Sequence, residues 1–298
     1  MLLLQSFLTT NFTNFSFYFC VFLCNLWLIH EFMSLRFLSL ASGSSGNCYY
    51  LGTEEYGILF DAGISVRTIK KVFKDHRIGQ EQILAVFITH DHADHIKSVG
   101  VLGEKYNIPV YATEKVHEGI NKSRYVDEKL FASRRIIEKE IPVNIKDFRI
   151  TAFDIPHDSS DNVGYLIEFG EHKIVLATDA GHISDTMAQY IKIANHLIIE
   201  ANYDLEMLRT GNYPAFLKER IRNGWGHLSN RETADFLAAN FDLHLKNIWL
   251  CHLSKDNNHP ELAYKTVEMA LGQYGIRVGK DVNLSALKRT NPSDMFFF

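Results

Sequence analysis

The sequence predicts an α/β fold in one domain. Short apolar runs alternate with helical segments through the second half of the chain, and no internal repeat, low-complexity linker or second composition shift follows residue 34. Of the 298 residues, 46% are hydrophobic, which is ample for a compact core. Length alone would also allow two small domains. We therefore expect residues 34–298 to form a single domain.

The first expected strands lie between Leu35 and Gly63, where apolar runs alternate with turn residues. These runs are RFLSLA, CYYLG and GILFDAG, and the turn SGSSGN separates the first two. The β-branched run at 83–89 predicts a buried strand. The segment HIKSVGVLGEKYN at 95–107 then predicts a helix, and PVYAT predicts an extended segment.

The same patterns predict further elements in the second half. The strands are expected at 148–155, 164–169, 173–177 and 196–199, and a helix at 186–194. Two more helices have specific start signals. Ser229 followed three residues later by Glu232 is a capping-box pattern, and Pro260 suits the first position of a helix.

Residues 1–33 differ from the rest of the chain, since they are rich in Phe, Leu and Asn and their only charge is Glu31. They lack the basic start of a signal peptide. The apolar stretch at 15–29 is shorter than the ~20 residues that span a bilayer comfortably. Because a strand pattern begins directly after Met33, we expect an upstream extension outside the working protein. A weak membrane anchor and an ordered part of the fold are the alternatives.

The net charge of -4 gives no overall attraction to nucleic acid. Any phosphate-binding surface must be local, such as 122–124 or 218–222, although such runs are usually solvated faces. The four cysteines are too few and too scattered for a disulfide framework. A reducing compartment, the cytoplasm, is therefore expected.

The segment ITHDHADH places three histidines and two aspartates within six positions, directly behind an apolar run. His90, His92, Asp94 and His95 offer imidazole and carboxylate ligands for Zn²⁺, Mn²⁺ or Fe. Without a bound ion, protonated imidazoles would repel one another and half-buried polar groups would lack partners. The spacing therefore predicts a metal site rather than a solvated loop.

Three more ligand-type residues stand at the ends of expected strands. His157 follows ITAFDIP, Asp179 ends IVLATD and His252 ends NIWLCH. Strand-end loops collect at one edge of a sheet, where a site can be built on a rigid scaffold. Each of these residues alone would be better explained as structural. Together with the loop at 88–95, they indicate one shared site.

These motifs resemble those of the metallo-β-lactamase superfamily. The matching segments are THDHADH at 89–95, PHDS at 156–159, TDAGH at 178–182 and CHLS at 251–254. The resemblance covers about residues 35–285 and implies an αββα sandwich, with two mixed β-sheets flanked by helices. The pair Asp94–His95 is similar to that of the two-metal hydrolase and nuclease branches.

Other segments resemble the YycJ/WalJ family, described as metal-dependent 5′-to-3′ DNA exonucleases. They are LASGSSGNCYYL, DAGIS, IEANYD, MLRTGNYP, GHLSN and HLSKDNN. GHLSN followed by CHLS is also similar to the paired histidine motifs of ribonuclease Z, in which the first histidine acts at the scissile phosphate and the second binds metal. A nucleic acid substrate, DNA in the first instance, is implied.

The resemblance implies two divalent metal ions, Zn or Mn. The first would be held by His90, His92 and His157, the second by Asp94, His95 and His252, with Asp179 bridging. Such a pair activates a bridging hydroxide and neutralises phosphate oxygens. Asp94 could also orient or deprotonate the water, and His227 would protonate the departing alkoxide. The structural alternative for His227 is simple packing at a helix start.

Five further residues are expected to support the site or the substrate: Asp61, Glu200, Ser45, Asn47 and Asn258. Asp61 and Glu200 would accept a hydrogen bond from an imidazole and so orient it. The turn with Ser45 and Asn47 offers backbone amides to a phosphate, or is a plain hairpin. Asn258 would contact the nucleotide or cap the following helix.

Two other functions stay open. The same metal centre could hydrolyse a small thioester or lactone, because fold and ligands do not define the substrate. His227 favours the nuclease, since an acyl substrate would not need that acid in the same way. The other alternative is a non-enzymatic regulator anchored to a membrane by residues 15–29. No obligate protein partner is inferred.

Overall fold

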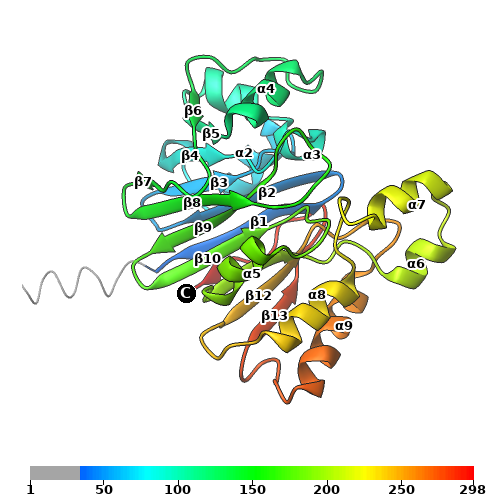
Figure 1. The fold of residues 1–298 in the computed structure, drawn as a ribbon. Helices are drawn as coiled ribbons and strands as arrows, with labels where there is room; N and C mark the ends of the chain where they lie inside the picture. Colours follow the sequence, from blue (N-terminus) through cyan, green and yellow to red (C-terminus); the bar gives the residue numbers. More distant parts are fainter. Residues whose placement is uncertain (1–33) are drawn as a thin grey trace, which may run out of the picture.

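The computed structural model describes residues 34–298, so the expectations for residues 1–33, including an anchor at 15–29, fall outside the described residues. Two seven-stranded sheets face each other, and helices cover their outer faces (Figure 1). This is the αββα sandwich that the motif resemblance implied. Among residues 34–298, no helix is long and apolar enough to cross a membrane.

The first sheet has the strand order β14-β1-β2-β3-β4-β5-β6. It is antiparallel from β14 to β3 and parallel from β3 to β6. The strands are β1 (Arg36–Gly43), β2 (Gly46–Gly52), β3 (Gly57–Phe60), β4 (Ile83–Phe87), β5 (Val110–Ala112), β6 (Arg134–Ile136) and β14 (Phe296–Phe297).

The second sheet has the order β13-β12-β11-β10-β9-β8-β7. It is antiparallel from β7 to β10 and parallel from β10 to β13. The strands are β7 (Val143–Ile145), β8 (Phe148–Asp154), β9 (Val163–Phe169), β10 (His172–Ala177), β11 (His196–Glu200), β12 (Asn247–Cys251) and β13 (Asn283–Ala286). Because β10, β11 and β12 run parallel, their carboxyl ends meet at one edge.

Large aromatic side chains fill the space between the sheets. Phe37 and Trp249 come from opposite sheets, and their ring centroids lie 4.6 Å apart. Tyr165 from the second sheet similarly packs on Phe60 and Phe87 of the first, at centroid distances of 5.3 and 5.6 Å. Aromatic pairs of this kind stabilise a fold by more than the burial of their surface area alone. The two sheets therefore form a rigid base for the loops at their ends.

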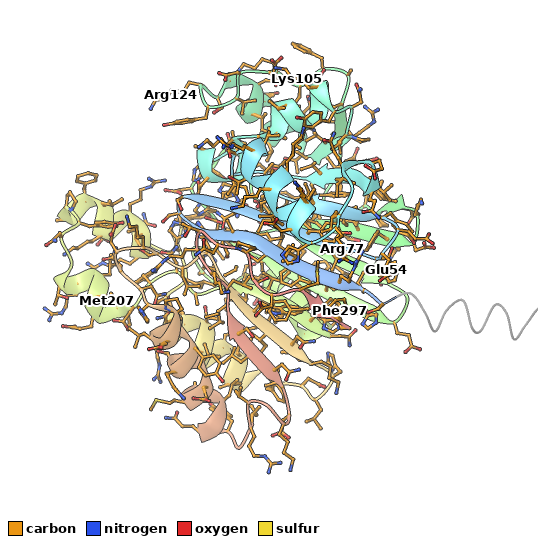
Figure 2. All side chains as sticks on the ribbon, turned by 180° about the vertical axis from the view of Figure 1, so that it is seen from behind. Glu54, Arg77, Lys105, Arg124, Met207 and Phe297 are labelled. Atoms are coloured by element: carbon orange, nitrogen blue, oxygen red, sulfur yellow. The ribbon has the colours of Figure 1, made fainter. Side chains whose placement is uncertain are left out.

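The helices are α2 (Val66–Asp75), α3 (Ala93–Ile96), α4 (Glu114–Lys122), α5 (Asp185–Lys192), α6 (Leu205–Thr210), α7 (Ala215–Arg222), α8 (Asn230–Ala239) and α9 (Pro260–Gln273), and a 3₁₀ turn, η1, spans Gln80–Gln82. The capping box of Ser229 and Glu232 is formed, and Pro260 is the first residue of its helix, as predicted. The α6–α7 pair stands away from the sandwich in Figure 1. From behind, Figure 2 shows Met207 on α6 and Arg124 beyond α4 at separate margins of the molecule.

The helix predicted at 95–107 is interrupted. α3 ends at Ile96, and a π-helix, η2, spans Val101–Lys105. The reason is tertiary, because the backbone N–H of Ser98 donates to the carbonyl of Ala62, 2.8 Å away, instead of continuing a regular helix. Elements absent from the prediction include α2, α4, α6, α7 and the strands β6, β7, β13 and β14.

Candidate metal centre

The ligand-type residues gather where four strands end. His90 follows β4, His157 follows β8, Asp179 follows β10 and His252 follows β12 directly. With His92, Asp94 and His95 from the same loop as His90, they form one cluster of potential metal ligands. The structure thus brings together all seven residues that the sequence singled out for metal.

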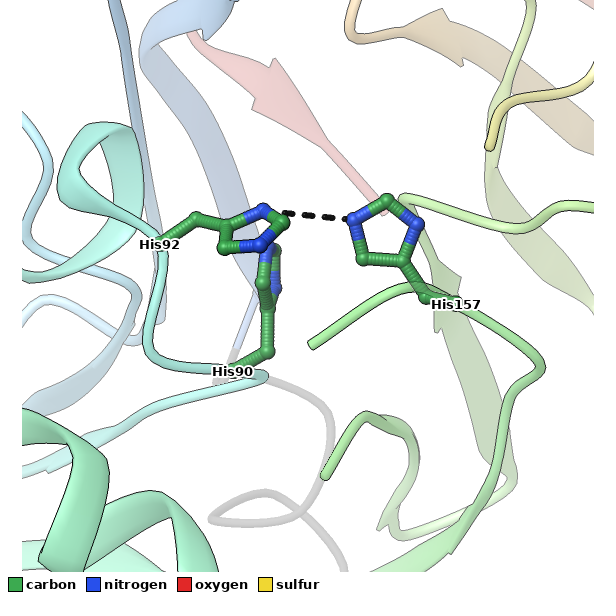
Figure 3. A group of neighbouring side chains, drawn as sticks. All are labelled: His90, His92 and His157. Carbon is green, nitrogen blue, oxygen red and sulfur yellow. Dashed lines mark hydrogen bonds between the residues drawn. The ribbon is translucent and has the colours of Figure 1, made fainter. Parts of the chain in front are cut away.

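His90, His92 and His157 form the first group (Figure 3). Each offers a ring nitrogen, and these atoms all lie within 4.8 Å of one another. Nε2 of His157 is 3.3 Å from Nδ1 of His92. His90 and His157 are buried, whereas His92 is partly exposed. Three imidazoles at this spacing can bind one divalent ion.

Asp94, His95 and His252 form the second group, with ligand atoms also within 4.8 Å of one another. Oδ2 of Asp94 lies 3.3 Å from Nε2 of His252 and 3.6 Å from Nε2 of His95. Asp179 stands between the groups. Its Oδ2 lies 3.2 Å from Nε2 of His95, and its Oδ1 lies 3.9 Å from Nε2 of His157.

The proton positions in the first group suit a metal ion. Nδ1 of His157 donates to the carbonyl of Gly226 at 2.8 Å, so Nε2 carries the lone pair. Nδ1 of His90 lies 3.0 Å from Oγ1 of Thr89, while its buried Nε2 has no hydrogen-bond partner within residues 34–298. A buried imidazole whose second nitrogen is already held is typical of metal ligands. The residues present therefore fit a divalent cation.

Asp61 holds the imidazole of His95. Its Oδ2 accepts from Nδ1 of His95 at 2.7 Å, and its Oδ1 accepts from the backbone N–H of Thr89 at 2.9 Å. All three side chains are buried. This directs Nε2 of His95 toward Asp179, which is the geometry expected of an orienting carboxylate.

Glu200 is fully buried at the end of β11, and both of its oxygens have partners. Its Oε2 accepts the backbone N–H groups of Ala180 and Leu228, at 2.9 and 3.1 Å. Its Oε1 accepts from His227, as expected, and also from His252, which the sequence did not indicate. Glu200 thus connects three separate segments at the cluster.

The buried carboxylates strongly affect the histidines. Burial alone would lower the pKa of His252, but Asp179, Asp94 and Glu200 raise this pKa to about 10. In contrast, burial and then the neighbouring His95 hold the pKa of His90 well below its usual range. His90 is therefore neutral with a free lone pair, beside a concentration of negative charge that attracts cations.

Three site residues have left-handed backbones. The φ angles of Asp61, Asp179 and His252 are 58°, 54° and 53°. This region is uncommon for residues other than glycine, and such strain collects at functional sites. The residue types do not predict these φ angles, because each angle is determined by the turn that follows a strand.

A model of the family described as "Beta-lactamase superfamily domain" matches residues 56–248, more than half of the chain. The chain belongs to the metallo-β-lactamase superfamily. It is also 38% identical to exodeoxyribonuclease YycJ of Bacillus anthracis, over 83% of this chain and 93% of that protein. Exodeoxyribonuclease WalJ of Streptococcus pneumoniae is 38% identical over 84% and 93%. The chain is thus a metallo-hydrolase of the YycJ/WalJ family.

Solved structures show the same superfamily fold. The YhfI protein of Bacillus subtilis, a metallo-β-lactamase fold protein, superposes with a TM-score of 0.66 at 17% identity, over 89% of this chain and 100% of that one. Zn²⁺-bound PqqB from Methylobacterium extorquens gives 0.64 at 15% identity, over 87% and 99%. At these identities the likeness shows the fold alone.

The residues expected at the substrate lie in different surroundings within this superfamily fold. Nδ2 of Asn47 is 3.0 Å from Nε2 of His95, at the centre. Ser45 is exposed on a two-residue hairpin turn, and its neighbour Ser44 lines the adjacent pocket instead. Asn258 is buried, and its amide nitrogen donates to the carbonyls of Ala201 and Asn202, both at 2.9 Å. Its side chain therefore connects loops, and a contact with the nucleotide stays a prediction.

A pocket of about 180 Å³ opens beside the cluster. Its polar lining residues are Ser44, Asp158, Asn202, Tyr213, Arg220, His227 and Ser254. Asn202 was not predicted, yet its amide nitrogen donates to the carbonyl of His252 at 2.7 Å. Arg220 comes from α7 and was visible in the sequence only as part of a charged run.

Proposed function

We propose that this metallo-hydrolase is a two-metal phosphodiesterase that removes nucleotides from the 5′ ends of DNA. The proposed ligands are His90, His92 and His157 for one ion and Asp94, His95 and His252 for the other, with Asp179 between them. The exodeoxyribonuclease names of the relatives support this substrate. Zn²⁺ or Mn²⁺ suits these donors. A cytoplasmic location and independence from a protein partner stay predictions.

The position of His227 is the observation that carries the proposal. Its Nδ1 donates to Oε1 of Glu200 at 2.8 Å, which leaves Nε2 for a substrate. The side chain is 21% exposed and lines the pocket beside the cluster. A positioned imidazole of this kind protonates a departing alkoxide, which is typically worth ~10²-fold to 10⁴-fold in rate.

The hydrolysis needs one proton donor and one proton acceptor. Bound divalent ions lower the pKa of a water and neutralise phosphate charge. The water oxygen forms the new bond to phosphorus, the bond from phosphorus to O3′ breaks, and O3′ receives the proton of His227. The carboxylate of Asp94, which is 23% exposed, orients the water and accepts its proton.

The test is release of mononucleotides from duplex DNA labelled at its 5′ end, by the full chain with Mn²⁺ or Zn²⁺. We expect release by the wild type and loss in Asp94→Ala. Asp91→Asn removes a charge from the same loop outside the two proposed ligand sets and serves as the control. A wild type that binds two metal ions but releases no nucleotide contradicts the proposal and favours thioester or lactone substrates.

A further inference from the structure

We propose that the pocket beside His227 binds the 5′-terminal nucleotide, and that Arg220 binds the phosphate at its 5′ end. This inference rests on the proposed function. The pocket lies between α7, which supplies Leu217, Arg220 and Ile221, and the loops of the cluster. Figure 1 shows α7 beyond the edge of the sheets, on an arm formed with α6.

The direction of cleavage places the terminal nucleotide on this side. In 5′-to-3′ removal, the bond that breaks joins the scissile phosphorus to O3′ of the terminal nucleotide. The terminal nucleotide is therefore the leaving group, and it lies next to the acid that protonates O3′. Because His227 is the proposed acid and lines the pocket, the leaving nucleotide occupies the pocket.

Arg220 is suited to a phosphate. Both Arg220 and His227 line this pocket, but only the guanidinium of Arg220 keeps its positive charge at every pH near neutrality. Its Nε donates to Oδ2 of Asp158 at 2.5 Å, and its side chain is 54% exposed. The two Nη groups have no hydrogen-bond partner in the described part of the chain. They are free for the two-point contact that guanidinium makes with phosphate.

The pair also lies next to the proposed metal centre. Oδ1 of Asp158 is 3.5 Å from Nε2 of His157. Asp158 thus lies between Arg220 and the first ligand group. When the scissile phosphate lies at the proposed metal ligands, the next phosphate, at the 5′ end of the terminal nucleotide, would reach Arg220.

The pocket size limits what is recognised. Pockets for drug-sized ligands run about 300–1,000 Å³, whereas this one is about 180 Å³. It suits a phosphate and sugar, with the base outside. The hydroxyls of Ser44 and Ser254 add hydrogen-bond donors for phosphate oxygens, whereas the hydroxyl of Tyr213 already donates to Oδ2 of Asp256 at 2.9 Å. We therefore expect selection for a 5′-phosphate without selection for a base.

The test compares two DNA duplexes of one sequence, whose 5′ ends carry either a phosphate or a hydroxyl. We expect the wild type with Mn²⁺ to release the first nucleotide about tenfold to a hundredfold faster from the phosphorylated end, as for a charged hydrogen bond. Arg220→Gln reduces this ratio to near one, and Arg220→Lys keeps part of it. Arg222→Gln is the control, since Arg222 is exposed on the same helix and paired with Glu219 at 2.9 Å.

Asp158→Asn separates phosphate binding from the ion pair. This variant removes the charge that faces Arg220 but keeps the guanidinium, so the preference for a 5′-phosphate should remain. Equal loss of the preference in Asp158→Asn and Arg220→Gln would overturn the proposal, as would equal wild-type rates from both ends. Failure of the proposed function is distinct, because then neither duplex is degraded.

Discussion

His227 and His252 are held by the same carboxylate oxygen. Nδ1 of each imidazole lies 2.8 Å from Oε1 of Glu200. Since both N–H groups donate to this atom, both Nε2 atoms point away from it. That of His252 lies 3.3 Å from Oδ2 of Asp94, within the second ligand group. One buried side chain therefore orients a proposed metal ligand and the proposed acid together.

Glu200→Gln should weaken metal binding and DNA hydrolysis together, each by about 10-fold to 100-fold. A glutamine amide keeps the shape but has one acceptor oxygen, so it cannot serve the two imidazoles and also the backbone N–H groups of Ala180 and Leu228. Metal titration against a chelator and DNA turnover measure the two effects. Glu219→Gln, on the exposed face of α7, is the control. Loss of turnover with unchanged metal affinity would show that Glu200 acts on His227 alone.

His227→Ala should affect substrates according to their leaving groups. We expect a loss of ~10²-fold to 10⁴-fold on DNA, whose alkoxide must be protonated as it leaves. The loss on bis(p-nitrophenyl) phosphate should be much smaller, because nitrophenolate departs without a proton. Steady-state kinetics with both substrates test this, with the exposed His182→Ala as the control. Equal losses on both would favour a packing role for His227.

Asp61→Asn should lower metal affinity by about 10-fold to 100-fold. Asp61 accepts from Nδ1 of His95 at 2.7 Å and from Thr89, so its charge orients a proposed ligand and favours its metal-binding tautomer. Competition with a chelator measures the affinity, with Asp242→Asn, an exposed carboxylate, alongside. Unchanged affinity would mean that packing alone positions His95.

The strands and the ligand-bearing loop could be predicted from local sequence patterns, whereas the αββα sandwich was implied by the motif resemblance. In the loop 88–95 the ligand-type residues are neighbours in sequence, so their spacing is known without the fold, and the preceding strand has a clear apolar pattern. The capping box at Ser229 is equally local. The split of the helix at 95–107 is not, because it depends on a hydrogen bond from Ser98 to the distant Ala62.

The unpredicted parts of the candidate site depend on tertiary structure. The shared oxygen of Glu200 joins β11 to loops 27 and 52 residues away. Arg220 meets Asp158 across 62 residues. Such pairs have no fixed spacing, so residue types alone could indicate the participants but not their partners.

His196 should make the protein less stable in mild acid. It is buried at the start of β11, where Nδ1 accepts from Asn247 at 2.8 Å and Nε2 lies 3.0 Å from Nδ1 of His172. Burial, and then His172, lower the pKa of His196 from 6.5 to about 3. The unfolded chain therefore binds a proton between these values that the folded chain does not. The contribution of His196 to the free energy of unfolding is therefore fully present above pH 6.5 and is lost as the pH drops toward 3.

At pH 5 this residue should reduce the free energy of unfolding by about 2 kcal/mol relative to pH 8. Protonation of Nδ1 would also place an N–H opposite the amide donor of Asn247, whose Oδ1 already accepts from Asn283 at 3.1 Å. In His196→Gln the difference between the two pH values should shrink by that amount, measured by urea unfolding. The exposed His182→Gln should keep the wild-type difference. If His196→Gln also keeps it, His196 is not the source of the acid sensitivity, and other buried groups must bind the proton on unfolding.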